Sequence, residues 1–221
     1  MYETELLSKF SKMPVFSLAD VSQIVRSRDY SKVMISRMVK KGKVKRIKRD
    51  TYTLHEDPLL VSTFLVKPSY VSSISSLYLH KKITQIPNEV FCFTSNLPKR
   101  FFFIIPINFF HTDYFFGFEN EKYDEFEIPV ATDEKAIIDS VGKVPLSVVE
   151  EAFENLKIER MVEYLKKIGK SSFAKRIGFL LEKNGYDVYQ ELKGLIKGSY
   201  IPLDPLVKTH KRKNEKWKVF V

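Results

Sequence analysis

The sequence predicts an α+β protein, and three patterns along the chain predict it. Three short segments with helical spacing of apolar residues come first and lead into two short strands that a tight turn joins. Residues 89–130 are then dense in aromatic and β-branched residues with turn residues between them, which is typical of an antiparallel sheet. Residues 132–196 return to helical spacing. We therefore expect a mainly antiparallel sheet that C-terminal helices cover, after a smaller N-terminal domain.

Two helices are expected in the first 25 residues. The first spans residues 2–12 and ends before Pro14, because proline lacks the amide that a helix interior needs. The second lies within residues 16–25. There Ser17 is a suitable N-cap and Asp20 follows three residues later, which is the spacing of a capping box.

A third helix and a basic hairpin follow a short turn, in residues 30–54. Ile35, Met38 and Val39 recur at i, i+3 and i+4, so one stripe of this helix is expected to face a core while its polar side chains face outward. Gly42 is expected to end the helix, because glycine readily adopts the positive φ found just after a helix end.

Two strands, within residues 43–49 and 51–54, meet at a turn that includes Asp50. The second strand alternates between apolar and polar residues, as a half-buried strand does. In the first strand Val44 and Ile47 are three residues apart, so a regular strand would place their side chains on opposite faces. We therefore expect Val44 to belong to the helix exit or to a β-bulge. Asp50 stands where a turn glycine is usual, and aspartate tolerates the left-handed conformation.

Positive charge is concentrated on this third helix and hairpin. Residues 30–50 hold nine Lys or Arg against one acid, a net of +8, whereas the whole chain has a formal net charge of +10. Such a density of charge attracts a phosphate backbone, and each Lys or Arg that meets a phosphate releases a counterion. A solvated charged helix and hairpin without a partner is the alternative explanation. The candidate DNA-binding residues are Ser31, Lys32, Ser36, Arg37, Lys40 and Lys41 on the helix and Lys45, Arg46, Lys48 and Arg49 in the hairpin.

Three helices followed by a two-stranded hairpin predict a winged helix-turn-helix at residues 1–56, with the α+β domain at residues 57–221. In that geometry the third helix enters the major groove of DNA, and the hairpin contacts a flanking phosphate or the minor groove. Arg37 is the expected base reader, since a guanidinium pairs bidentately with guanine. Lys48 is expected to contact phosphate, so that its loss weakens binding to all sequences alike.

The second domain is expected to begin after a connection at residues 55–60. Residues 68–82 have apolar residues at helical spacing with serines between them, and the serines indicate either close helix packing or a ligand surface. Strands are expected at residues 89–94, 100–105, 109–118 and 125–130, with turns near Asn96, Pro106 and Gly117.

Five helices are expected to follow the strands. They run from the N-cap Thr132 to Gly142 and then lie at residues 145–156, 158–169, 171–185 and 186–196. The tail, residues 208–221, is basic and ends in alternating apolar residues. It is either a terminal strand that docks on the sheet, which we prefer, or a loose basic arm.

Composition limits the class of protein. With 221 residues, 44% of them hydrophobic, and no apolar run of bilayer length, the chain is expected to be a folded cytoplasmic protein that does not enter a membrane. Cys92, the only cysteine, lies in an apolar strand and is expected to be buried and unreactive. The four histidines are dispersed, and no zinc spacing, phosphate-binding glycine loop or hydrolase motif occurs. We therefore expect no metal, no cofactor and no enzymatic activity.

One group of residues suggests a nuclease as an alternative. Two acids and a lysine at residues 133–135 lie between Glu127 and Asp139, and such a group can hold Mg²⁺ and orient water. That site would need these residues at strand ends, whereas here they follow a capping threonine and are expected to form a first helical turn. A Mg²⁺-dependent nuclease is therefore less favoured. A protein-interaction adaptor, whose α+β domain binds another protein, is the other alternative.

Several segments, taken in order along the chain, resemble the AbiEi family of type IV toxin-antitoxin systems. The N-terminal MVKKGKVKRIKRDTYTLHEDP is similar to the family's winged-helix end, with its helix, glycine, basic strands and tyrosine. The further segments that resemble the family are PSYVSSISSLYLHKKITQIP, VATDEKAIIDSV, FAKRIGFLLEKNG and SYIPLDP, followed by Trp217.

The resemblance implies a DNA-binding transcriptional regulator. Its winged-helix domain would bind an inverted-repeat operator in double-stranded DNA and repress its own operon. Its C-terminal domain would counteract a nucleotidyltransferase-like toxin. The residues themselves support only the first of these two roles, and they leave the oligomeric state open.

Overall fold

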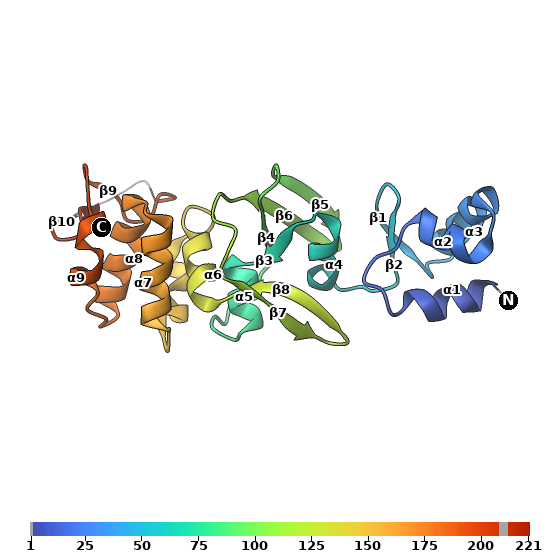
Figure 1. The fold of residues 1–221 in the computed structure, drawn as a ribbon, viewed down its shortest axis with the longest axis horizontal. Helices are drawn as coiled ribbons and strands as arrows, with labels where there is room; N and C mark the ends of the chain where they lie inside the picture. The colour runs from blue at the N-terminus through green and yellow to red at the C-terminus, as the bar shows by residue number, and fades with distance from the viewer. Residues whose placement is uncertain (1, 208–211) are drawn as a thin grey trace. The chain divides into compact units, whose positions relative to one another are not determined.

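The computed structural model describes residues 2–207 and 212–221 (Figure 1). The protein is α+β, with helices in its N-terminal part and a mixed β-sheet. It forms two compact units: the first comprises Met1–Val71, Asn88–Asp113 and Asn120–Pro129, and the second comprises Ser72–Pro87, Tyr114–Glu119 and Val130–Val221. The domain boundary expected after residue 56 marks a part of the chain that would fold by itself. Contacts within the folded chain do not test this, so the boundary stays a prediction. No helix in the described ranges is long and apolar enough to cross a bilayer.

The N-terminal elements of the first unit follow the predicted order. They are the helices α1 (Tyr2–Phe10), α2 (Leu18–Val25) and α3 (Arg28–Lys40) and the strands β1 (Lys45–Lys48) and β2 (Thr51–Thr53). The predicted capping box is present at α2, because the Ser17 side chain accepts a hydrogen bond from the Asp20 amide and Asp20 accepts one from the Ser17 amide. Helix α3 begins earlier than predicted because Ser27 caps it, its side chain accepting from the Tyr30 amide.

These elements share one apolar core. Phe10 of α1 stacks on Phe16, with ring centroids 4.1 Å apart. Phe16 also exchanges two backbone hydrogen bonds of 2.8 Å with Tyr52, and these bonds tie the segment before α2 to the hairpin. The buried residues of the core are Leu6, Phe10, Phe16, Val21, Val25, Ile35, Met38 and Val44.

The chain leaves α3 as predicted. Gly42 has a φ of 71°, in the left-handed region that favours glycine. Val44 is buried in the core before β1 begins, so it belongs to the helix exit. The bulge lies further on, because the register of the hairpin shifts between Arg46 and Lys48.

The mixed sheet follows helix α4 (Pro58–Leu65). Its strands are β3 (Ser69–Val71), β4 (Val90–Thr94), β5 (Lys99–Phe103), β6 (Ile105–His111), β7 (Phe118–Tyr123) and β8 (Phe126–Ala131), in the spatial order β5-β6-β4-β3-β8-β7. β3 pairs with β4, and β5 with β6, in antiparallel fashion. β4 and β6 pair in parallel, so the sheet is mixed, where a mainly antiparallel sheet was expected.

Two expectations for the middle of the chain are wrong. Residues 68–82 do not form one helix, because Ser69–Val71 forms β3 and helix α5 is confined to Ser73–Leu79. Tyr70 is fully buried in the sheet, and strand pairing with β4 overrides the helical spacing of this segment. The single strand expected at residues 109–118 is also absent, because β6 ends at His111 and β7 begins at Phe118. Among the described residues the sheet has six strands, where about four were expected.

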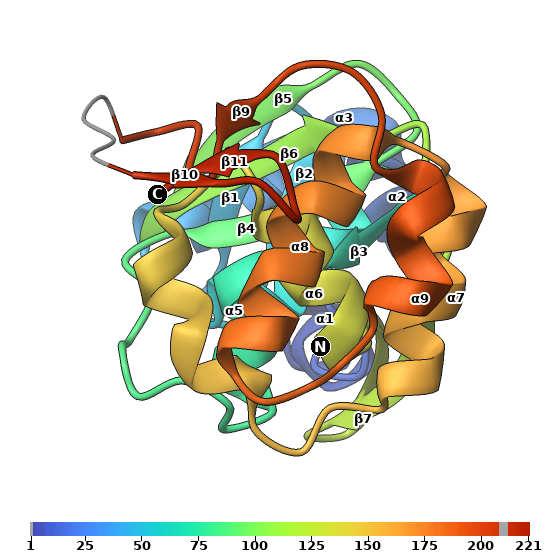
Figure 2. The ribbon, with the colours of Figure 1, turned by 90° about the vertical axis from the view of Figure 1, so that its left-hand side faces the viewer.

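The second unit contains most of the C-terminal helices. They are α5, α6 (Asp133–Ser140), the 3₁₀ helix Leu146–Phe153, α7 (Ile158–Ile168), α8 (Ser171–Lys183), α9 (Tyr189–Leu192) and the 3₁₀ turn Lys193–Leu195. α9 packs against both α7 and α8 (Figure 2). The serines of α5 serve helix packing, since Ser73 shares a hydrogen bond with Ser140 at 2.7 Å and Ser76 donates to the Ala131 carbonyl at 2.6 Å.

The end of the tail forms a strand, but in another sheet than expected. β11 (Val219–Phe220) pairs with β9 (Ile201–Pro202) and β10 (Lys213–Asn214) in a separate three-stranded sheet. Trp217 is fully buried, and its indole donates to Glu182 at 3.0 Å. Burial of this ring against α8 anchors the tail. The tail's first residues, 208–211, lie outside the described part of the chain.

Candidate nucleic-acid interface

The buried face of α3 includes one residue that was expected to contact DNA. Ser31 is 0% exposed, and its hydroxyl donates to the Ser27 carbonyl at 2.6 Å. It lies one turn before Ile35, so it shares the face that packs into the core. The expectation that Ser31 points outward is therefore wrong, and the i,i+4 relation to Ile35 was the signal that sequence reasoning missed.

The outward face of α3 lies opposite this buried stripe. At 3.6 residues per turn it is centred on Val33, Ser36 and Lys40, all of which are exposed. Val33 is 46% exposed although it is apolar, so it offers a methyl surface to a partner. Ser36 and Lys40 are thus exposed, as expected of the polar side of α3, and their contact with DNA stays a prediction.

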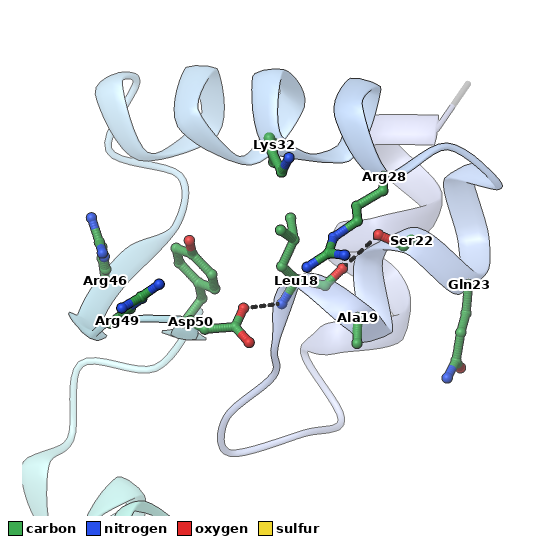
Figure 3. Close-up of a pocket in the computed structure, with 10 residues that line it drawn as sticks. Leu18, Ala19, Ser22, Gln23, Arg28, Lys32, Arg46, Arg49 and Asp50 are labelled. Atoms are coloured by element: carbon green, nitrogen blue, oxygen red, sulfur yellow. Dashed lines mark hydrogen bonds between the residues drawn. The ribbon is translucent and has the colours of Figure 1, made fainter.

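A groove lies between α2, the start of α3 and the hairpin. It has a volume of about 890 Å³, and we call it the hairpin groove (Figure 3). Figure 3 shows Arg28 and Lys32 entering it from α3, and Arg46 and Arg49 facing it from the hairpin. Its lining residues are Leu18, Ala19, Ser22, Gln23, Arg28, Lys32, Arg46, Arg49, Asp50 and Tyr52.

The hairpin groove collects positive charge from two separate elements. Three of its four cations, Lys32, Arg46 and Arg49, were predicted from the sequence. Arg28 was missed, because the helix was expected to begin two residues later. The signal was available, since Arg28 precedes Lys32 by four residues and so lies on the same flank of α3.

Lys32 pairs with an acid on its own helix. Its ammonium lies 3.0 Å from Asp29, and the hydrogen bond from Lys32 lowers the pKa of that carboxyl. Asp29 is in the first turn of α3, where the positive end of the helix also favours a carboxylate. Both side chains are well exposed, and an exposed pair of this kind contributes little. Lys32 can therefore exchange this partner for a phosphate at low cost.

Arg37 lies on the other flank of α3. With Lys41 it lines a second groove of about 290 Å³, whose other residues include Tyr2 and Glu3 of α1. Arg37 does not line the hairpin groove. It is exposed beside the outward face, so its role as base reader stays a prediction.

The basic side chains of the hairpin differ in the partners that the protein itself gives them. Arg46 donates to the Lys48 carbonyl at 3.3 Å and remains exposed, as does Arg49. Lys45 lies 2.7 Å from the exposed carboxylate of Glu56. Of the predicted cations in the hairpin, the two arginines are thus the best placed to meet a phosphate.

Lys48 is held differently from the expectation that it projects toward DNA. Its ammonium donates to the Leu65 carbonyl at 2.7 Å and lies 5.1 Å from the centre of the Phe101 ring. Burial, aided by the nearby Lys99, lowers the pKa of Lys48. Because the protein's own Leu65 carbonyl and Phe101 ring already hold this ammonium, we remove Lys48 from the proposed set of phosphate contacts.

The triplet considered for a nuclease forms the first turn of α6, as predicted. Thr132 caps the helix, its hydroxyl accepting from the Lys135 amide. Lys135 is fully buried and forms an ion pair with Asp139 one turn later. Asp139 also accepts from Ser72 at 2.8 Å. This buried pair has the contacts of a core interaction between α5 and α6.

The two acids of the triplet also have partners within the second unit. Asp133 lies 2.7 Å from His80 Nδ1 and 3.4 Å from the Lys82 ammonium. Burial alone raises the pKa of Asp133, but these two partners outweigh burial and lower it. Glu134 accepts from the Lys157 amide at 2.9 Å. Among the described residues, no three His, Cys, Asp or Glu side chains are grouped to hold a metal ion.

Cys92 has the environment expected of a buried thiol. It is 0% exposed in β4, and this burial raises the pKa of the thiol to about 12, although a hydrogen bond with Ser62 opposes the change. At neutral pH the group is a thiol and not the reactive thiolate. The prediction of a buried cysteine is confirmed.

Comparison with known proteins adds no assignment to this geometry. No family model matches the chain, and no curated protein matches it at a significant level of similarity. Function must therefore be inferred from the site itself, because a fold class alone does not specify one.

Proposed function

We propose that the protein binds double-stranded DNA through α3 and the β1–β2 hairpin and acts as a transcriptional regulator of winged-helix type. The observation that carries this proposal is the hairpin groove, where exposed cations from α3 and from the hairpin converge. Helix and hairpin each contribute two of these side chains. Such an arrangement is suited to a polyanion that runs past both elements at once.

The outward face of α3 is suited to the major groove. Val33 offers methyl groups that can contact a thymine methyl, and Ser36 offers a hydroxyl that can donate to or accept from base edges. Lys40, one turn beyond Ser36, would meet phosphate. With the helix in that position, Arg46 and Arg49 would lie along the flanking backbone or minor groove.

The positive charge of this surface determines how the affinity for DNA should depend on salt. Each cation that neutralises a phosphate releases a counterion, so the affinity for any duplex should fall steeply with salt. Base contacts from the α3 face would add the smaller, sequence-dependent part of the affinity. A regulator needs both parts, whereas a surface that is merely solvated and charged has only the first.

Two measurements on the full-length protein test the proposal. Fluorescence anisotropy at low salt, with a labelled mixed-sequence duplex of about two helical turns, should show saturable binding. Selection from a duplex pool with a randomised centre should then enrich a common sequence. Absence of binding at low ionic strength would refute DNA binding. Binding without any enrichment would refute the regulator role and leave a non-specific DNA-binding protein.

The resemblance to the AbiEi family extends the proposal to an antitoxin. Only the resemblance supports this part, in which the second domain counteracts a nucleotidyltransferase-like toxin. The test is co-expression with the product of a nucleotidyltransferase-like gene from the same operon, where such a gene exists. Growth should be restored by this protein, and a toxin that remains fully active in its presence would contradict the antitoxin role.

A further inference from the structure

Asp50 makes a contact across the fold from the tip of the hairpin. Its Oδ1 accepts a hydrogen bond of 2.9 Å from the backbone amide of Leu18, which is 32 residues away in the sequence (Figure 3). Leu18 is the first residue of α2. Asp50 itself has a φ of 56°, so the turn places it in the left-handed region. The hairpin tip is therefore joined to the start of a helix by a side chain.

The contact stabilises the start of α2. The first amides of a helix have no partner within the helix, and the helix dipole makes that end attractive to a carboxylate. Ser17 and Asp20 already satisfy part of the α2 terminus through the capping box. The capping box does not include the Leu18 amide, and Asp50 supplies the acceptor for it.

The base of the hairpin and its tip are held by different contacts. At the base, Tyr52 exchanges two backbone hydrogen bonds of 2.8 Å with Phe16. Between base and tip the strand register shifts after Arg46, which loosens the ladder at that point. The contact of Asp50 with Leu18 spans this irregular part and fixes the tip against α2.

An acid at this place is unexpected for a surface that meets phosphate. Asp50 lines the hairpin groove together with Arg46 and Arg49, and its charge opposes an approaching polyanion. If charge alone mattered, any neutral residue would serve the groove better. The hydrogen bond gives the acid a role that offsets this repulsion.

We propose that Asp50 is a positioning residue of the DNA interface, whose bond to the Leu18 amide holds the hairpin tip so that Arg49 faces the groove. The tip also orients the guanidinium of Arg46, which donates to the Lys48 carbonyl. This inference rests on the proposed function, because it concerns the arrangement of the same surface. It assigns Asp50 a role that acts through the two arginines, without contact to DNA.

Two substitutions at the same position separate positioning from charge. Asp50→Asn and Asp50→Gly both remove one negative charge, and both residues tolerate the left-handed φ of the turn. The asparagine side-chain oxygen can still accept from Leu18, whereas glycine has no acceptor. Any difference between the two variants therefore reports the hydrogen bond.

Positioning predicts that the two variants differ in affinity for a mixed-sequence duplex at low salt. Asp50→Asn should bind at least as tightly as wild type, because it loses the repulsion and keeps the bond. Asp50→Gly should bind more weakly than Asp50→Asn by roughly tenfold, of the order expected for one hydrogen bond to a charged or polar partner. The slope of log K against log salt should also be shallower in Asp50→Gly, by up to about 1.8, which is the contribution of the two phosphate contacts made by Arg46 and Arg49.

Hydrogen exchange provides a readout that needs no DNA. The Leu18 amide should lose protection in Asp50→Gly and keep it in Asp50→Asn, while thermal unfolding confirms that both variants fold. Equal affinity of the two variants, or unchanged protection of Leu18 in Asp50→Gly, would overturn the positioning role. Wild type that binds no duplex at all would refute the proposed function, and with it this inference. Binding by wild type with no difference between the variants would refute only the inference.

Discussion

The sharpest test of the interface is the salt dependence of DNA binding when cations are removed from the hairpin groove. The structure places four cations there, two on α3 and two in the hairpin. If each neutralises one phosphate, these four cations contribute about −3.6 to the slope of log K for a duplex against log salt. Over a fourfold rise in salt, from about 50 to 200 mM, this contribution alone would lower the affinity about 150-fold.

The perturbation is the pair of substitutions Arg46→Gln and Arg49→Gln in one protein. It removes two of the four cations and should reduce the contribution of the groove to about −1.8, so that over the same rise in salt this contribution lowers the affinity only about 12-fold. The matched control is Lys9→Gln with Lys12→Gln. Both lysines are exposed at or just after α1 and do not line the hairpin groove, so their loss changes net charge equally.

Fluorescence anisotropy titrations at several salt concentrations measure both slopes. The control variant should keep a slope close to that of wild type, because distant exposed charges are screened at these ionic strengths. An equal reduction of the slope in both variants would show that overall charge, and not the groove, attracts the duplex. A wild-type slope near zero would contradict the phosphate contacts altogether.

Three further outcomes follow from other parts of the chain. Arg37→Ala should cost roughly 1 to 3 kcal/mol on a selected site but little on random duplex; equal losses on both would remove its role as base reader. A Cβ at Gly178 would overlap the Trp217 ring, so Gly178→Ala should lower the free energy of unfolding by about 1 to 3 kcal/mol, measured by tryptophan fluorescence in urea. Gly194→Ala, where space is open, is its control and should not destabilise the protein. The lowered pKa of Asp133 means that its stabilising contribution is present above the ordinary value of 3.8 and is lost as pH falls through the folded-state pKa. Asp133→Asn should therefore flatten the acid loss of stability in circular dichroism, and an unchanged acid limb would contradict the ion-pair assignment.

Local signals in the sequence determined several helix ends and the N-terminal hairpin. Ser17 with Asp20, Gly42 and Thr132 act through backbone groups only a few residues away, so their roles follow from the sequence without knowledge of the fold. The density of Lys and Arg in residues 30–50 was also readable directly. These features account for the order of elements and for most of the candidate interface.

Tertiary contacts decided which of those side chains are exposed and can meet a partner. Ser31 is buried because its helix turns that face toward the core, and Lys48 is engaged by the Leu65 carbonyl from another element. Arg28 joins the groove because Ser27 starts α3 earlier than the apolar spacing indicated. Such assignments depend on helix phase and on partners distant in sequence, which a local pattern does not contain.

The same distinction holds for the rest of the fold. Residue type indicated strands in the Phe-rich region, but the parallel pairing of β4 with β6 and the separation of β3 from α5 depend on which strands meet in space. Lys135 is charged, yet it is buried because Asp139 lies one turn away and neutralises it. The sequence by itself thus determined the α+β class and the basic helix and hairpin. Only the tertiary structure decided the groove that they form, because a groove is made by side chains that distant backbone contacts bring together.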